Sequence, residues 1–137
     1  MLHRDGKVEA IKQVPLFADL AKGELRHIAQ IADELDFKPG KVLCRQGAFG
    51  REFFVILEGT CDVSRDGKKV DSMGDGEFFG EVALLMDAPR NATVTASSAL
   101  RALVITDRAF RELLKDQPAI ATKVLATVAG RLPPQDV

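Results

Sequence analysis

The residues best suited to bind a ligand lie in one continuous segment, residues 78–94. Gly80 and Glu81 open it, a short helix-like stretch follows over residues 82–86, and Arg90 comes nine positions after the carboxylate. The start of a short helix offers free backbone N–H groups and a positive dipole end, both of which attract a compact anion. The segment therefore predicts an anion site that interrupts a run of strands.

The side chains of this segment suit two different parts of one ligand. Arg90 carries a planar fork of donors that can hold two phosphate oxygens at once. Glu81, as an ionised carboxylate, only accepts hydrogen bonds, so it suits a sugar hydroxyl and not a phosphate. Gly80 lets another molecule approach the backbone closely. Together these features fit the ribose-phosphate of a nucleotide; a simple salt bridge between Glu81 and Arg90 is the alternative.

The order of the residues favours the nucleotide. Residues 79–84 run Phe-Gly-Glu-Val-Ala-Leu and residues 90–94 run Arg-Asn-Ala-Thr-Val. This string resembles the phosphate-binding cassette of cyclic nucleotide-binding domains, the family of kinase regulatory subunits, nucleotide-gated channels and the bacterial catabolite activator protein. The resemblance covers nearly the whole chain: residues 15–17 resemble the family's entry helices, residues 54–59 its early barrel strands, and Phe110 its first C-terminal helix.

The resemblance implies a role for each cassette position. Arg90 would pair with the cyclic phosphate, and the backbone N–H groups of Ala83 and Asn91 would complete its cradle. Glu81 would accept the ribose 2′-hydroxyl, and Gly80 would admit the sugar. The expected ligand-binding residues are Val63, Val70, Gly80, Glu81, Val82, Ala83, Arg90, Asn91 and Ala92.

The apolar members of this set have a second explanation. Val63, Val70 and Val82 match positions where the family places walls against the sugar and the base, yet ordinary barrel core fits the sequence equally well. No catalytic residue, metal ligand or cofactor is expected; the expected ligand is cAMP, with cGMP the alternative.

The choice of base rests on Asn91 and on the last helix. In cGMP-selective members a hydroxyl after the arginine resembles a guanine contact; the Asn91 side chain could accept from guanine's amine or point to solvent. No aromatic residue follows Phe110, so an aromatic lid from the last helix is excluded. Lys123, Thr127 and Arg131 share one helical face and remain candidates to cover the base, or are plain surface residues.

The surrounding chain predicts a single domain over residues 1–137, with one sizeable core. Helices are expected over about 8–33, short strands over about 35–105, including the cassette, and helices over about 107–132. Asp66-Gly67 between two apolar runs predicts a tight hairpin. The fold class is therefore α+β: an antiparallel β-barrel (jelly-roll, double-stranded β-helix) flanked by N-terminal helices and two C-terminal helices.

The last helical region shows a predicted apolar stripe. Pro118 separates a helix marked by Phe110 from a final one that ends at Pro133-Pro134. The predicted stripe of the final helix is Ala121, Val124, Leu125, Val128 and Leu132. We expect phosphate contacts to pull the cassette inward, Leu84 and Leu85 to repack, and residues 119–132 to close over the base.

Composition limits the other possibilities. A net charge of -1 and a pI near 6.1 argue against direct nucleic-acid binding. No run approaches the ~20 apolar residues of a membrane span, and no signal peptide opens the chain. Cys44 and Cys61 lie in apolar runs and are expected to be reduced, buried thiols, which fits a cytoplasmic protein.

Other classes of function fit the sequence less well. A cupin-type enzyme needs several histidine and carboxylate ligands, and only His3 and His27 exist. A fragment of a cAMP-responsive transcription regulator would carry its helix-turn-helix module outside this chain. A degenerate interaction module would bind no nucleotide, although Glu81 and Arg90 are both intact. Expected partners are a cyclic nucleotide, an effector protein or domain outside the chain, and a second copy through the last helix.

Overall fold

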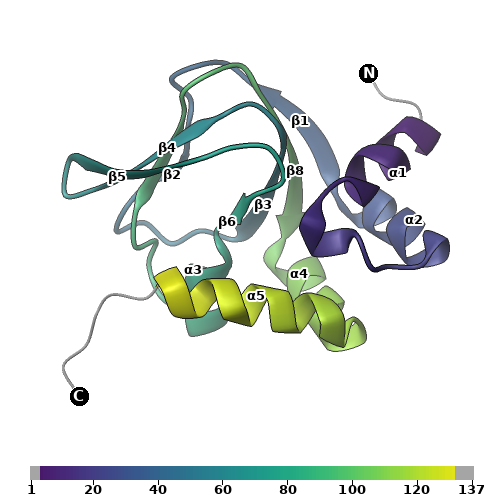
Figure 1. The fold of residues 1–137 in the computed structure, drawn as a ribbon. Coiled ribbons are helices and arrows are strands. Elements are labelled where there is room, and N and C mark those ends of the chain that lie inside the picture. Colours follow the sequence, from purple (N-terminus) through teal and green to yellow (C-terminus); the bar gives the residue numbers. More distant parts are fainter. Residues whose placement is uncertain (1–3, 132–137) are drawn as a thin grey trace.

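The computed structural model describes residues 4–131, in which the strands form two four-stranded antiparallel sheets and the helices from both ends of the chain gather beside them (Figure 1). The first sheet has the strand order β1 (Asp33–Phe37), β8 (Leu100–Thr106), β3 (Glu52–Glu58) and β6 (Phe78–Phe79). The second has the order β2 (Val42–Cys44), β7 (Thr93–Ala96), β4 (Cys61–Arg65) and β5 (Lys68–Met73). The helices are α1 (Arg4–Lys12), the 3-10 turn η1 (Pro15–Phe17), α2 (Lys22–Ile31), α3 (Glu81–Met86), α4 (Asp107–Asp116) and α5 (Pro118–Arg131).

The first sheet is covered on both of its faces. Successive side chains of a strand point to opposite faces, so the apolar run of β3 is divided between two cores. Phe53 and Val55 belong to the core beneath the helices, whereas Phe54 and Ile56 belong to the core between the two sheets. This double burial explains why β3 is apolar throughout its centre and does not alternate with polar residues.

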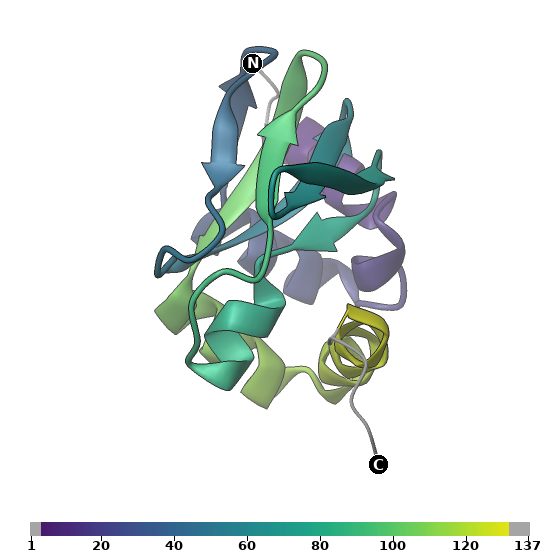
Figure 2. The same cartoon turned by 90° about the vertical axis from the view of Figure 1, so that its left-hand side faces the viewer.

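The helices from the two ends of the chain share one core on the outer face of the first sheet (Figure 2). Phe53 of β3 stacks on Phe110 of α4 with ring centroids 4.4 Å apart. Thr106 caps α4, since its hydroxyl accepts a hydrogen bond from the Ala109 N–H at 3.2 Å. Pro118 opens α5, where its missing N–H costs nothing. Helix α4 therefore packs directly on β3, the strand that pairs with β6 just before the cassette helix.

The hairpin of β4 and β5 forms as the Asp-Gly pair predicts. Asp66 and Gly67 both adopt positive φ, 54° and 80°, which is the backbone of a tight two-residue turn. Further along, the register shifts: Val63 lies opposite Asp71, but Ser64 lies opposite Lys69. Val70 is the extra residue of a β-bulge.

The α+β class, with two antiparallel sheets and helices at both ends, is confirmed. Several boundaries differ from the expected ones: α1 begins at Arg4, β1 already begins at Asp33, and the cassette helix begins at Glu81. The assignment of Leu125 to the buried stripe of α5 is wrong, because this side chain is 60% exposed.

The buried stripe of α5 is instead formed by Ile120, Val124 and Val128. Leu132, Pro133-Pro134 and His3 lie outside the described residues. Within residues 4–131, no helix combines the length and the apolar character needed to cross a membrane. The single-domain division over residues 1–137 stays a prediction.

Candidate functional site

A cavity of about 360 Å³ lies between the second sheet, the cassette and the end of α5. All of the expected ligand-binding residues except Arg90 line it: Val63, Val70, Gly80, Glu81, Val82, Ala83, Asn91 and Ala92. The fold therefore brings two distant valines of the β4–β5 hairpin to the same cavity as the cassette.

Gly80 fixes the entrance to the cassette helix. It adopts the left-handed conformation, with φ of 99°, which side-chain-bearing residues rarely adopt. A Cβ atom here would lie 2.8 Å from the Glu52 carbonyl oxygen and 3.0 Å from Arg90 Nη1. A glycine is thus required for two reasons: the backbone conformation and the close packing of β3 and Arg90.

Arg90 is buried against the backbone next to the cavity. Only 7% of it is exposed. Its Nη1 donates to the Gly80 carbonyl and its Nη2 to the Glu52 carbonyl, both at 2.8 Å. The guanidinium also lies against Gly50, where any Cβ would overlap it. Arg90, the side chain predicted to bind the phosphate, therefore lies at the edge of the cassette. Both of its terminal nitrogens donate to carbonyl groups of the protein.

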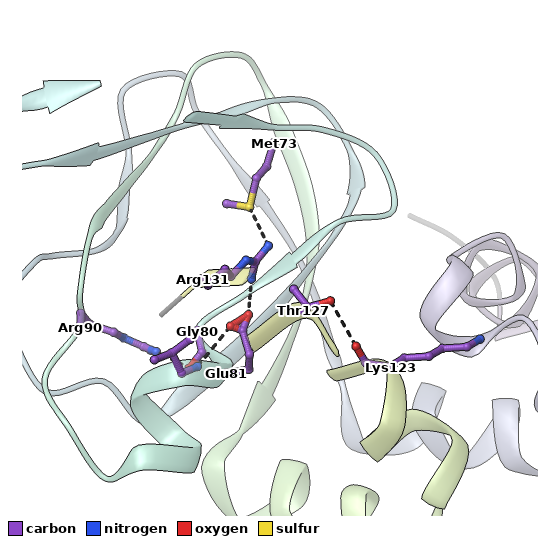
Figure 3. Close-up of polar contacts among 8 residues, drawn as sticks. Met73, Gly80, Glu81, Arg90, Lys123, Thr127 and Arg131 are labelled. Atoms are coloured by element: carbon purple, nitrogen blue, oxygen red, sulfur yellow. Dashed lines mark hydrogen bonds and ion pairs between the residues drawn. The ribbon is translucent and has the colours of Figure 1, made fainter. Parts of the chain in front are cut away.

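Glu81 pairs with an arginine other than Arg90. Its side chain is 1% exposed, and its Oε1 accepts from Nη1 of Arg131 on α5, as Figure 3 shows. Its Oε2 accepts from the Val82 N–H at 3.2 Å. The alternative of a salt bridge between Glu81 and Arg90 is wrong for this structure, because Arg90 donates to carbonyls and Arg131 supplies the ion pair.

Arg131 makes two further contacts around the same carboxylate. Its Nη2 lies 3.5 Å from Met73 Sδ (Figure 3). Its guanidinium lies 5.3 Å from the centre of the Phe78 ring. Burial raises the pKa of Glu81 above the ordinary value of 4.5, and the positive charge of Arg131 opposes that rise. Arg131 thus compensates a charge that the surrounding protein disfavours.

The other two lid candidates contact the protein elsewhere. Lys123 Nζ donates to the Pro15 carbonyl at 2.7 Å and pairs with Asp19 at 2.9 Å. Thr127 donates to the Lys123 carbonyl at 3.2 Å. Both line a groove of about 600 Å³ beside the cavity, which Arg131 also borders. Of the three candidates, Arg131 alone lines the cavity itself.

Several lining residues were not predicted from the sequence. Arg65 lines the cavity, and its Nε donates to the Asn91 carbonyl at 2.9 Å, which fixes the peptide after Asn91. Strand alternation could have found it, because residues two apart on a strand share a face, and Val63 was already expected there. Asp71 also lines the cavity, and only the bulge at Val70 brings these two consecutive residues to it.

Cys44 forms part of the cavity wall and Cys61 lies deeper between the sheets; both are free thiols. Burial raises the pKa of each to about 11. Because the thiolate is the reactive form, neither side chain is suited to nucleophilic chemistry at neutral pH. Among the described residues, no group of three or more histidine, cysteine and acidic side chains is arranged to hold a metal ion, and His27 is an exposed residue of α2.

Comparison with known proteins agrees with this geometry. The profile of the cyclic nucleotide-binding domain matches residues 34–117. A putative potassium channel protein of Rhodopseudomonas palustris is 35% identical over 124 residues, which are 88% of this chain and 30% of that protein. A cGMP-dependent protein kinase of Toxoplasma gondii is 40% identical over 108 residues, 78% of this chain and 11% of that protein.

Solved structures show the same fold. A cAMP-bound structure of PfPKA-R superposes with a TM-score of 0.85 at 25% identity, over 93% of this chain and 44% of that one. The chain therefore belongs to the cyclic nucleotide-binding domain family, and its relatives include a channel protein and a protein kinase. It spans less than a third of the length of these two curated relatives.

The buried carboxylate gives a test by pH. Since the pKa of Glu81 in the folded protein is raised above 4.5, the folded protein binds the Glu81 proton more tightly than the unfolded protein does. The contribution of Glu81 to the free energy of unfolding therefore falls as pH rises above about 4.5. We expect the wild type to lose stability relative to Glu81→Gln between about pH 4 and pH 8 in urea titrations. Glu112→Gln, at an exposed position of α4, is the matched control. A stability difference between wild type and Glu81→Gln that stays constant over this range would contradict the assignment.

The position of the Arg90 guanidinium can be tested at Gly50. Gly50→Ala should displace the guanidinium and break its two carbonyl hydrogen bonds, lowering the free energy of unfolding by about 1–3 kcal/mol. Gly23→Ala, in α2 and with no atom near its added Cβ, should instead gain up to about 1 kcal/mol. Equal effects at both glycines in chemical denaturation would be the contrary result.

Proposed function

We propose that this domain is a cyclic nucleotide sensor whose cavity binds the ribose and the cyclic phosphate, with cAMP preferred over cGMP. The observation that carries the proposal is the shared cavity of Gly80, Glu81, Ala83 and Asn91. These residues come from the two halves of the cassette, and a binding site needs both halves on one cavity.

In the proposed complex, the phosphate replaces backbone carbonyls as the partner of Arg90. The guanidinium now donates to the neutral carbonyls of Glu52 and Gly80. A charged phosphate oxygen is the stronger acceptor, so turning the side chain toward the cavity exchanges weaker hydrogen bonds for charge-assisted ones. The N–H groups of Ala83 and Asn91 complete the phosphate site, and Ala92 lies beside it.

Sugar and base occupy the rest of the cavity. Glu81 accepts the 2′-hydroxyl of the ribose, and Val63, Val70 and Val82 provide apolar walls. The solved relative PfPKA-R is described as cAMP-bound, which supports adenine. The cGMP-dependent kinase among the relatives is the reason to test both nucleotides. Arg131 is the lid candidate within reach of the base.

We further propose that binding moves the C-terminal helices through the cassette. Arg111 of α4 donates to the Leu84 carbonyl of α3, and its Nε pairs with Asp107 at 2.7 Å. Leu84 is 2% exposed and packs in the helical core. An inward shift of α3 therefore acts on α4 through both a hydrogen bond and apolar packing, and then on α5. Such a shift requires that the nucleotide bind the two arrangements with different affinity.

What the moving helices control lies outside this domain. The matched relatives are several times longer than the chain, so an effector in the same or another polypeptide is the proposed partner. A transcription regulator is one such context. Within the described part of α5, Leu125 is the one large apolar side chain that is exposed, and a homodimer through this helix stays a prediction.

Calorimetry tests the ligand. The wild type should bind cAMP more tightly than cGMP, and Arg90→Ala should weaken cAMP binding by about 2–5 kcal/mol, the usual loss when one partner of a buried charged contact is truncated. Arg108→Ala, which removes the same charge from a side chain 92% exposed on α4, should bind as the wild type does. Absence of binding for both nucleotides would refute the proposed function.

Amide exchange tests the helix movement. With saturating cAMP, exchange of the amides in α4 and α5, residues 107–131, should change, because the Arg111 link and the Leu84 packing tie α4 to the cassette. Residues 22–31 of α2 are the internal reference. Helix movement would be excluded if α4 and α5 kept the same protection while cassette residues 81–86 became protected.

A further inference from the structure

Glu81 is already fully engaged in this structure. One carboxylate oxygen accepts from the Val82 N–H and the other from Arg131, while only 1% of the side chain is exposed. Glu81 and Arg90 are the two charged residues that are buried in the described part of the chain. While Arg131 is in place, almost none of the carboxylate surface is accessible to a further hydrogen-bond donor.

A ribose hydroxyl would therefore meet an obstacle at the place where the proposed function needs it. The hydroxyl must donate to Glu81, but the Arg131 guanidinium already donates to Glu81 Oε1, and both residues line the cavity (Figure 3). Arg131 is 30% exposed and lies at the end of the described part of α5, so it can withdraw without disturbing the helical core. The Glu81 carboxylate is less free to move, since its side chain is 1% exposed and its Oε2 accepts from the Val82 N–H.

We propose that Arg131 and the nucleotide's 2′-hydroxyl compete for Glu81, so that Arg131 is a specificity-determining residue that sets how strongly the site distinguishes ribose from deoxyribose. The inference rests on the proposed function and adds a residue to it. A ligand with the hydroxyl displaces Arg131; a ligand without it leaves the ion pair in place.

The adjoining groove provides a place for the displaced guanidinium. Arg131 borders both the cavity and this groove of about 600 Å³. Asp71 and Glu77, two exposed carboxylates, line the groove together with the Phe78 ring over which Arg131 already lies. A short rotation toward the groove exchanges one carboxylate for others nearer to solvent and keeps the aromatic contact, so release costs less than full exposure of an unpaired charge.

The competition can be measured by comparing the affinity of the domain for cAMP with its affinity for 2′-deoxy-cAMP. The ratio of the Kd for 2′-deoxy-cAMP to the Kd for cAMP reports the value of the 2′-hydroxyl. Because both ligands carry the same adenine, the contacts of the base with residues other than Arg131 cancel in this ratio. Competition from Arg131 lowers the ratio, since the hydroxyl must first displace a cation from its acceptor.

The experiment measures this ratio by calorimetry at about pH 8 for the wild type, Arg131→Gln and Lys123→Gln. We expect Arg131→Gln to raise the ratio at least about threefold, the scale of a partly exposed ion pair. Lys123→Gln removes the same charge from the same helix face but does not contact Glu81, and should leave the ratio unchanged. Arg131→Lys, with a shorter reach and the same charge, should give an intermediate value.

Each outcome decides a separate point. An unchanged or lower ratio in Arg131→Gln, or an equal rise in Lys123→Gln, overturns the competition while cAMP binding itself survives. If the wild type binds neither cAMP nor cGMP, the proposed function fails and the competition fails with it. Far-UV circular dichroism checks the fold of each variant, and Arg131→Lys decides the question if Arg131→Gln does not fold.

Discussion

The dominant constraint in this structure is the negative charge of Glu81, held where only 1% of its side chain meets solvent. Burial of a carboxylate is costly unless cations or N–H groups surround it. Here the backbone N–H of Val82 and the guanidinium of Arg131 supply that surrounding from two separate elements. The end of α5 is thereby tied to the first residue of the cassette helix, and both members of this ion pair line the cavity.

Around this ion pair, Arg90 and Arg131 donate to different acceptors. Arg90 donates to the Glu52 carbonyl of β3 and to the carbonyl of Gly80, and so joins β3 to the residue that precedes α3. Arg131 joins the cassette to the C-terminal helix. The first sheet can support both because each of its faces has its own core, one under the helices and one between the sheets. The site thus lies at the junction of the two cores.

The α+β fold, the hairpin turn and the six cavity-lining residues of the cassette could be predicted because they depend on local signals: periodicity, Asp-Gly and a contiguous motif. Val63 and Val70 were predicted only through the family resemblance. The sequence could not predict the partner of Glu81, since Arg131 is fifty positions away and one helical face offered three equally suitable side chains. Leu125 was misplaced for a related reason. Helical spacing alone does not show whether Val124 or its neighbour Leu125 lies at the centre of the buried face. In the structure Val124 packs in the core and Leu125 is exposed.

The β-bulge in the hairpin has a consequence for how this site can change during evolution or design. One inserted residue lets the consecutive Val70 and Asp71 both line the cavity, although strand alternation would send one of them to the opposite face. Deleting a single residue of β5 would restore the regular ladder and change the chemistry of that wall from two side chains to one. The cassette would remain untouched. The lining of this wall and the proposed phosphate site can therefore vary independently, through insertions or deletions in one segment and substitutions in the other.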